Sequence, residues 1–136
     1  MSVQFIDNSM RVRAAINDAV IAGLYEAAGE VESEVKRNTR VDTGQTKNAW
    51  QYRVDESKGE ATIGNPLENA IWEEYGTGEY AVNGDGRKGG WVYTDRNGNT
   101  HFTKGKKPTR VLQSAFESKK ATVERIIQSK LQEGMR

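Results

Sequence analysis

The sequence predicts an α+β fold in which a small antiparallel sheet packs with a long N-terminal helix and a C-terminal helix. Apolar residues recur at helical spacing between residues 7 and 40, at strand spacing between residues 50 and 64, and at helical spacing again after residue 108. The 136 residues suffice for a single domain, residues 1–136, in which the glycine-rich stretch 76–108 is expected to be a mobile arm.

The N-terminal helix is predicted from apolar residues that follow one another in steps of three and four. These residues are Val12, Ile16, Val20, Leu24, Ala27, Val31 and Val35. About 30 residues at 1.5 Å each give a rod of about 45 Å, whereas a compact chain of this length has a radius of gyration of about 14 Å. Part of the helix is therefore expected to project beyond its own core, where small residues such as Ala19 and Gly23 permit close approach by another element.

A turn and a hairpin follow this helix. Asp42, Thr43 and Gly44 are interpreted as a capped turn, in which the two side chains bond local N–H groups and the glycine takes an unusual φ angle. Apolar and polar residues then alternate over 50–55. A second short run at 61–64 is predicted to pair with the first as an antiparallel hairpin.

The arm is predicted from glycine content and from one hairpin inside it. Residues 76–105 contain eight of the 14 glycines, too many for a continuous regular element. Two aromatic-rich runs flank Asn97 and Gly98, a pair that is typical of a two-residue turn. That turn predicts a register in which Tyr93 lies opposite Phe102.

Helices are predicted on both sides of the arm. Apolar residues at four-residue steps indicate a short helix over 67–75 that ends at Gly76. After Pro108, Thr109 is expected to cap a final helix that carries apolar residues at helical spacing. The apolar sides of four elements supply the expected common core. Its predicted members are Trp50, Tyr52, Ile63, Ile71 and Phe116.

Composition argues against most classes of enzyme. The chain has no cysteine, which excludes disulfides, thiolate zinc sites and cysteine nucleophiles, and its one histidine, His101, is expected on a surface strand. Adjacent Glu73 and Glu74 are typical of a solvated helix face rather than a cation site. No apolar stretch approaches the roughly 20 residues that cross a bilayer, and no signal-peptide pattern begins the chain, so a cytoplasmic location is expected. No cofactor and no metal are expected.

Charge is unevenly distributed, although the net charge is only +1. Residues 1–86 hold 8 basic and 15 acidic side chains, whereas residues 87–110 hold 7 basic and 1 acidic. A basic segment joined to an acidic body indicates contact with a polyanion, or packing of one subunit's arm on the acidic surface of its neighbour. A solvated, lysine-rich loop is the plain alternative.

Two short motifs suggest chemistry that their surroundings disfavour. Asp42-Thr43-Gly44 is the triplet of aspartic proteases, which use paired carboxylates, but here a long charged helix precedes it instead of strands. The stretch 84–90 is rich in glycine like a phosphate-binding loop, yet it lacks the Gly-Lys-Ser/Thr of that motif. An aspartic protease acting through Asp42 therefore remains only a distant alternative.

Basic residues interleaved with aromatic residues form the candidate contact surface for another subunit or for DNA. These residues are Arg87, Lys88, Lys104, Lys106, Lys107 and Arg110. The same pattern fits a sequence-independent DNA-binding module, which is the main alternative function.

Six segments occur in a distinctive order and spacing. They are a long helix, Val41–Gly44 before a strand with Trp and Tyr, Asn69–Gly78, Gly90–Tyr93, Thr103–Pro108 and Leu112–Phe116. This order resembles the small head-to-tail joining, or tail-completion, proteins of long-tailed, siphovirus-type bacteriophages and prophages. The entry to the last helix departs from the usual Pro-Phe-Leu-Arg-Pro-Ala of that family, because this chain has Pro-Thr-Arg-Val-Leu-Gln-Ser-Ala.

The resemblance implies a non-enzymatic structural protein of the virion, located at the head-to-tail interface and present in the host cytoplasm during assembly. It implies a hexameric ring of the chain with itself at the end of the tail tube. The implied partners are the tail tube protein, the head connector or stopper protein and genomic DNA in the lumen, with no membrane partner. It also implies an antiparallel sheet packed against long helices.

Overall fold

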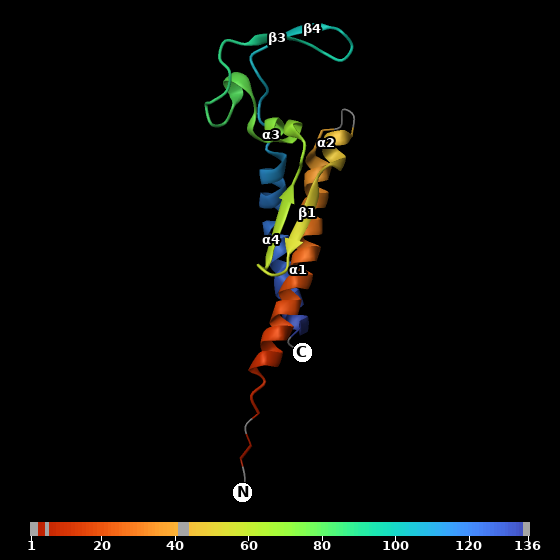
Figure 1. Cartoon of the computed structure of the whole chain (residues 1–136), viewed down its shortest axis with the longest axis vertical. Coiled ribbons are helices and arrows are strands. Elements are labelled where there is room, and N and C mark those ends of the chain that lie inside the picture. The colour runs from red at the N-terminus through yellow and green to blue at the C-terminus, as the bar shows by residue number, and fades with distance from the viewer. Residues whose placement is uncertain (1–2, 5, 41–43, 135–136) are drawn as a thin grey trace. The chain divides into compact units, whose positions relative to one another are not determined.

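The structure, a computed structural model, describes residues 3–4, 6–40 and 44–134 (Figure 1). In chain order its elements are α1 (Ser9–Asn38), α2 (Gln45–Asn48), β1 (Gln51–Asp55), β2 (Glu60–Gly64), α3 (Glu68–Tyr75), the 3-10 helix η1 (Gly78–Tyr80), β3 (Trp91–Thr94), β4 (Thr100–Thr103) and α4 (Val111–Gly134). β1 pairs with β2 and β3 with β4, each as an antiparallel two-stranded sheet. The predicted α+β class is confirmed, and α2 and η1 are short additions to it.

Contacts divide the chain into two compact units. The helix-pair unit contains the residues up to 34, residues 51–64 and the residues from 118 onward. The arm unit contains residues 35–50 and 65–117. The single-domain organisation stays a prediction.

Small residues let α1 and α4 lie side by side in the helix-pair unit. The buried stripe of α1 repeats every four residues through Ala19, Gly23, Ala27 and Val31. A Cβ atom at Gly23 would lie 2.7 Å from Cδ1 of Ile127, so a larger residue there would require the Ile127 side chain to shift. The predicted apolar stripe is therefore confirmed at Ala27, Val31 and Val35. Before residue 27 the buried positions are the smaller residues Ala19 and Gly23.

The β1–β2 hairpin belongs to the same unit and has the predicted antiparallel pairing, with Tyr52 opposite Ile63. The ring of Tyr25 on α1 meets that of Tyr52 edge-on, with centroids 6.4 Å apart. The Tyr25 hydroxyl also donates a hydrogen bond of 3.2 Å to Glu56 in the hairpin turn. These contacts attach the hairpin to α1.

Trp50 is the largest buried apolar side chain among the described residues, with an exposed fraction of 4%. Its Nε1 donates to Oγ1 of Thr39 at 2.8 Å, and that hydroxyl donates to the carbonyl of Val35 at 2.7 Å. Thr39 and Val35 are buried as well. The chain leaving α1 is thereby tied to the residue that precedes β1.

The predicted core is only partly correct. Trp50 is buried and Ile63 is half-buried, but Tyr52, Ile71 and Phe116 are exposed. The exposed fraction is 57% for Ile71 and 54% for Phe116.

The two helical errors have one cause. On α3 the buried residues are Ala70 and Glu74, and on α4 they are Val111 and Ala115. Ile71 and Phe116 each follow a buried alanine by one position, which turns a side chain by about 100° around a helix. The helical spacing was predicted correctly, but in each helix the buried stripe is the one that lies one residue earlier. Tyr52 lies on the hairpin face that contacts Tyr25 of α1, but 37% of the residue remains exposed.

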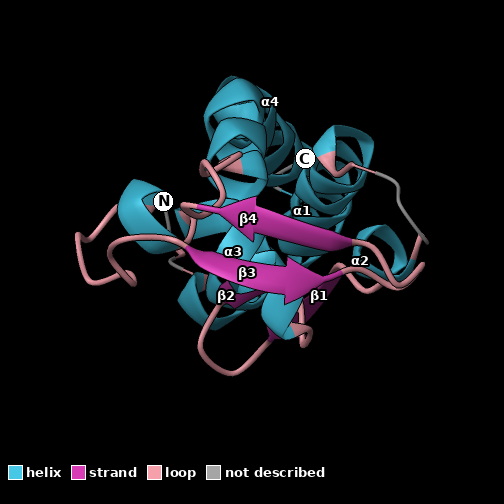
Figure 2. Ribbon diagram, turned by 90° about the horizontal axis from the view of Figure 1, so that it is seen from above, coloured by secondary structure: helices cyan, strands magenta, loops and turns pink. Residues whose placement is uncertain are grey.

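The predicted register of the arm hairpin is wrong by one residue. β3 and β4 lie antiparallel (Figure 2), with Tyr93 opposite His101 and Val92 opposite Phe102. The turn is longer than two residues because Asp95 organises it. One carboxylate oxygen of Asp95 accepts the N–H groups of Asn97 and Asn99, each at 2.9 Å.

Backbone hydrogen bonds complete this turn. The N–H of Gly98 donates to the carbonyl of Asp95 at 3.0 Å, and the N–H of Asp95 donates to Asn99 at 2.8 Å. Gly98 has a φ of 85°. This is the pattern of a three-residue loop whose last residue is left-handed, and it moves the pairing by one position.

Candidate assembly interface

The two ends of the arm are joined where it leaves α3 and enters α4. The N–H of Thr77 donates to the carbonyl of Lys106, and the N–H of Glu79 donates to the carbonyl of Lys104, each at 2.9 Å. The N–H of Lys106 returns a bond of 2.8 Å to the Thr77 hydroxyl. We call residues 76–79 and 104–106 the arm base.

Two glycines permit this contact. Gly78 and Gly105 have φ angles of 60° and 126°, in the region that side chains disfavour. A Cβ atom on Gly78 would overlap the carbonyl oxygen of Lys104, and one on Gly105 would overlap the carbonyl oxygen of Thr77. The backbones of the arm base therefore touch with no room for a side chain on either side.

Glu73 binds the end of the arm that leads to α4. Its carboxylate forms an ion pair with the ammonium group of Lys106. Its main-chain carbonyl accepts the N–H of Thr109 at 2.7 Å and the Thr109 hydroxyl at 2.8 Å. Thr109 therefore bonds to α3 and does not cap α4 as predicted.

Glu74 is the residue that caps α4. Its carboxylate, with 6% of the residue exposed, accepts the N–H of Leu112 at 2.8 Å and that of Gln113 at 3.1 Å. Arg110, which has a left-handed φ of 53°, places Nε 3.8 Å from the same carboxylate. The solvated-face interpretation is wrong for Glu74, because the free N–H groups of a helix start attract a carboxylate.

Replacing Glu74 with alanine is expected to destabilise the chain by about 2 kcal/mol, because two helix-end donors lose a charged acceptor inside the protein. Hydrogen exchange should show faster exchange at the amides of Leu112 and Gln113. Glu124→Ala, at an exposed position of α4, is the matched control. Unchanged exchange at both amides would contradict the assigned cap.

The six predicted basic residues separate into two groups. Four make contacts within the arm unit: Lys106 with Glu73, and three cations that lie over aromatic rings. These three are Arg87 over Trp91 at 5.5 Å, Lys107 over Tyr80 at 5.7 Å and Arg110 over Tyr75 at 5.3 Å. The other two, Lys88 and Lys104, are exposed and have no ion-pair partner among the described residues. Sequence patterns alone did not separate these two groups.

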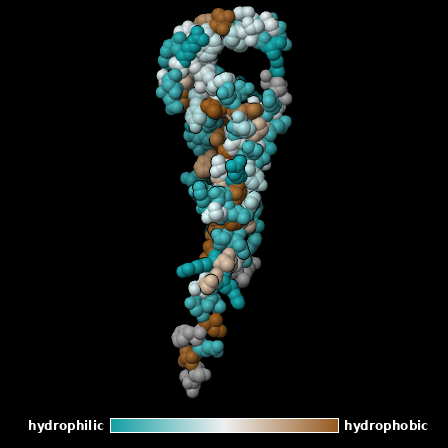
Figure 3. Space-filling view, viewed as in Figure 1, coloured by the Kyte–Doolittle hydropathy of each residue, from teal (hydrophilic) through white to brown (hydrophobic). Residues whose placement is uncertain are grey.

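The arm unit also exposes many large apolar side chains. They are Ile71, Trp72, Tyr75, Tyr80, Val82, Val92, Tyr93, Phe102 and Phe116. Figure 3 shows hydrophobic surface over β3 in surroundings that are largely hydrophilic. A concentration of exposed apolar surface is typical of an interaction site.

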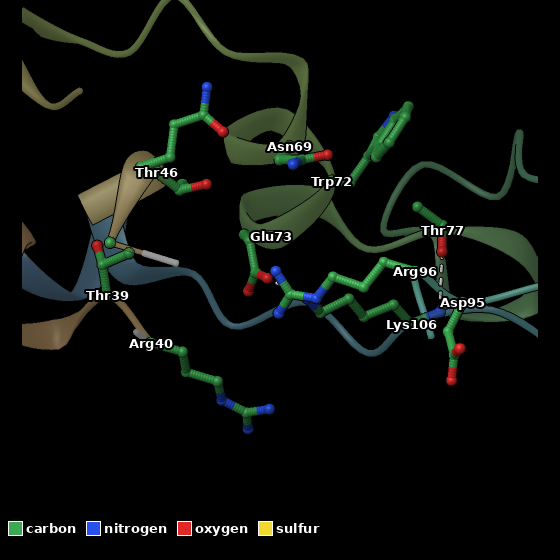
Figure 4. A pocket seen from close by; sticks show the side chains of 12 residues that line it. Thr39, Arg40, Thr46, Asn69, Trp72, Glu73, Thr77, Asp95, Arg96 and Lys106 are labelled. Atoms are coloured by element: carbon green, nitrogen blue, oxygen red, sulfur yellow. Dashed lines mark hydrogen bonds and ion pairs between the residues drawn. The ribbon is translucent and has the colours of Figure 1, made fainter. Parts of the chain in front are cut away.

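A polar cavity of about 620 Å³ lies in the arm unit beside the arm base. In Figure 4 the side chains of Arg96 and Lys106 point toward Glu73. Asp95 also lines the cavity, and its pKa is held below the ordinary value chiefly by a hydrogen bond with His101. The lining of this cavity thus includes both cations and carboxylates, which is compatible with contact to a polar protein surface.

Residues 4–76 match the family described as "Bacteriophage HK97-gp10, putative tail-component". The match covers more than half of the 136 residues. The chain belongs to the HK97-gp10-like family. Comparisons with curated proteins and with solved structures gave no match.

Membership of the HK97-gp10-like family confirms the resemblance to phage tail proteins. It makes this chain a structural component related to the bacteriophage tail, located in the virion and in contact with other virion proteins. The match runs from α1 through α3 and ends at Gly76, the first residue of the arm base. Roles for the arm must therefore come from its own contacts.

Other expectations for this HK97-gp10-like chain concern catalysis, metals and membranes. Gly44 has a φ of 82°, but Asp42 and Thr43 lie outside the described residues, so the capped turn and the protease alternative stay predictions. Within the described ranges, no group of three or more His, Cys, Asp or Glu side chains is placed to hold a metal. In the same ranges, no helix is both long and apolar enough to cross a membrane.

Proposed function

We propose that the chain assembles as a hexameric ring at the end of the tail tube and joins the tube to the head connector or stopper protein, with genomic DNA passing through the lumen. Family membership supports a role in the tail. The observation that carries the joining role is the arm unit, which presents exposed apolar and basic side chains from a hydrogen-bonded base.

The apolar side chains favour contact between proteins. Nine large apolar residues of the arm unit are exposed to solvent in the single chain. Burial stabilises an interface by about 25 cal/mol for each Å² of apolar surface removed from water. Association of subunits in a ring covers such surface without a change in fold.

The two exposed lysines favour an acidic neighbour, either DNA or protein. Lys88 and Lys104 are the predicted contact residues that retain a free ammonium group within the described chain. Exposed charges contribute little to folding, whereas they steer and select association. These two positions therefore test the proposed contact without disturbing the fold.

We expect the double variant Lys88→Glu with Lys104→Glu to fold normally and to reduce the yield of infectious particles about tenfold or more. A loss of about 1.4 kcal/mol in the binding free energy of the interface already raises its dissociation constant about tenfold. The control is Lys120→Glu with Arg125→Glu, which reverses two exposed charges on α4. Electron microscopy of the particles locates the defect. Tails without a terminal ring indicate a protein contact, and complete particles that lose DNA indicate a lumen contact. Normal yields from the arm variant would contradict the proposal.

A further inference from the structure

The β3–β4 hairpin has two different faces because successive side chains of a strand point in opposite directions. Trp91 and Tyr93 share one face. Val92 and its partner Phe102 share the other, where their exposed fractions are 63% and 64%. We call Val92 and Phe102 the hairpin pair. The Phe102 ring lies close to Gly90, and the rest of this apolar patch is exposed.

A groove of about 420 Å³ lies on the same unit, between α3 and the segment that leads to β3. Its apolar walls include Ile71, Trp72 and Tyr75 of α3, with Trp91 on the β3 side. All three α3 side chains are exposed, so the groove is open to a partner.

The chain does not fill this groove with its own hairpin pair. Trp91 lines the groove. Val92, the next residue along β3, points away from it because neighbouring strand residues face opposite sides. An apolar ridge and an apolar groove thus occur on one unit in an arrangement that prevents them from meeting within that unit.

We propose that the hairpin pair of one copy inserts into the α3 groove of the next copy, an inference that rests on the ring assembly proposed above. Charges agree with this pairing. Lys104 lies two residues after Phe102, just beyond the end of β4, while Asp85 lines the groove and Glu68 lies one turn before Trp72 on α3. Two cations lie over aromatic walls of the groove, Arg87 over Trp91 and Arg110 over Tyr75.

The contact is head to tail, because one surface meets a different surface on the neighbour. Such a contact leaves one groove and one hairpin pair open at the ends of a row of subunits. When the rotation between copies closes, both are covered and a ring results. In a symmetric dimer whose hairpin pairs contact each other, both α3 grooves stay open to solvent. Such a dimer therefore buries only one of the two apolar surfaces.

Cross-linking tests this contact cleanly, because the full chain has no cysteine. In the variant with both Ile71→Cys and Phe102→Cys, a short thiol-to-thiol reagent is expected to give a ladder of covalent oligomers, in solution at high concentration and on isolated tails. A mixture of the two single-cysteine chains is expected to give mixed dimers, at least fivefold more abundant than either homodimer. The matched control pairs Phe102→Cys with Phe116→Cys, another exposed phenylalanine position, and should give no ladder.

Three results would overturn the inference: a fast-migrating monomer linked within one chain, a product that stops at dimers, or a ladder no stronger than that of the control. Rings that are visible on tails without this cross-link leave the proposed function standing and remove only the head-to-tail contact. Chains that never bind tails defeat both.

A charge exchange gives a second, independent measurement on the same contact. Lys104→Glu is expected to reduce the ladder at least fivefold, and adding Asp85→Lys in the same chain is expected to restore more than half of it. A loss that Asp85→Lys fails to restore would argue against the pairing of Lys104 with the groove.

Discussion

Trp50→Ala is expected to lower the free energy of unfolding by about 3 to 5 kcal/mol, which is most of the stability of a small domain. Trp50 is the largest buried apolar side chain among the described residues, and its removal leaves a cavity beside the end of α1. The Thr39 hydroxyl also loses the indole N–H that it accepts at 2.8 Å. Thermal and denaturant unfolding of the full chain measure the effect.

Trp72→Ala is the matched control for this prediction. Trp72 is 48% exposed on α3, so its truncation should cost less than about 1 kcal/mol. Equal losses for the two tryptophans would show that burial of Trp50 does not organise the arm unit. The hydrogen bond is tested separately by Thr39→Val, which should cost about 1 to 3 kcal/mol, because it leaves the buried indole N–H without an acceptor.

Gly78→Ala is expected to open the arm base and to cost about 3 kcal/mol or more. An alanine at positive φ costs about 1 to 2 kcal/mol, and forcing a methyl group into packed atoms costs about 1 to 3 kcal/mol in addition. The overlapping atom is the carbonyl oxygen of Lys104, which is main chain and does not move as a side chain does. The amides of Thr77, Glu79 and Lys106 should then lose protection from hydrogen exchange.

Gly84→Ala separates the cost of placing alanine at a positive φ from the cost of steric overlap. Gly84 has a φ of 70°, but a Cβ atom there would meet no atom within 4 Å. This variant should therefore show only the conformational cost of about 1 to 2 kcal/mol and keep the arm base protected. If Gly78→Ala behaves like Gly84→Ala, the close approach of the two backbones does not contribute to stability.

Features that depend on neighbouring residues were predictable from the sequence. The helix α1, the β1–β2 hairpin, and the end of α3 at Gly76 each follow from spacing or from a local glycine. The φ of 76° at Gly76 agrees with the predicted helix end.

Features that depend on distant residues were not predictable. Glu74 caps a helix 38 residues further along the chain, so no local pattern distinguishes it from a solvated glutamate. The same cap turns Ala70 and Glu74 inward and leaves Ile71 outside. In the hairpin, Asn97-Gly98 favours a two-residue turn, but the Asp95 carboxylate binds two further N–H groups and selects a longer one.

The candidate contact residues show the same division. A run of basic residues was evident in the sequence, and so were the aromatic residues among them. Which cations are available depended on the fold, because Lys106 binds Glu73, whereas Lys104, two residues earlier, has no ion-pair partner among the described residues. The Val92–Phe102 pair likewise appeared only once the register was known.

The closed arm base has an evolutionary consequence. Because residues 76–79 and 104–106 hold each other directly, the chain between them can lengthen or shorten without moving α3 or the start of α4. Each doubling of a flexible loop costs only about 0.6 kcal/mol in closure entropy. Changes of length at exposed loop positions between residues 80 and 103 therefore cost little in folding, whereas substitutions at Gly78, Gly86 and Gly105 are costly because a Cβ atom there would overlap main-chain atoms. Related phages can therefore differ in the surface that the arm presents to a partner while they keep the same arm base.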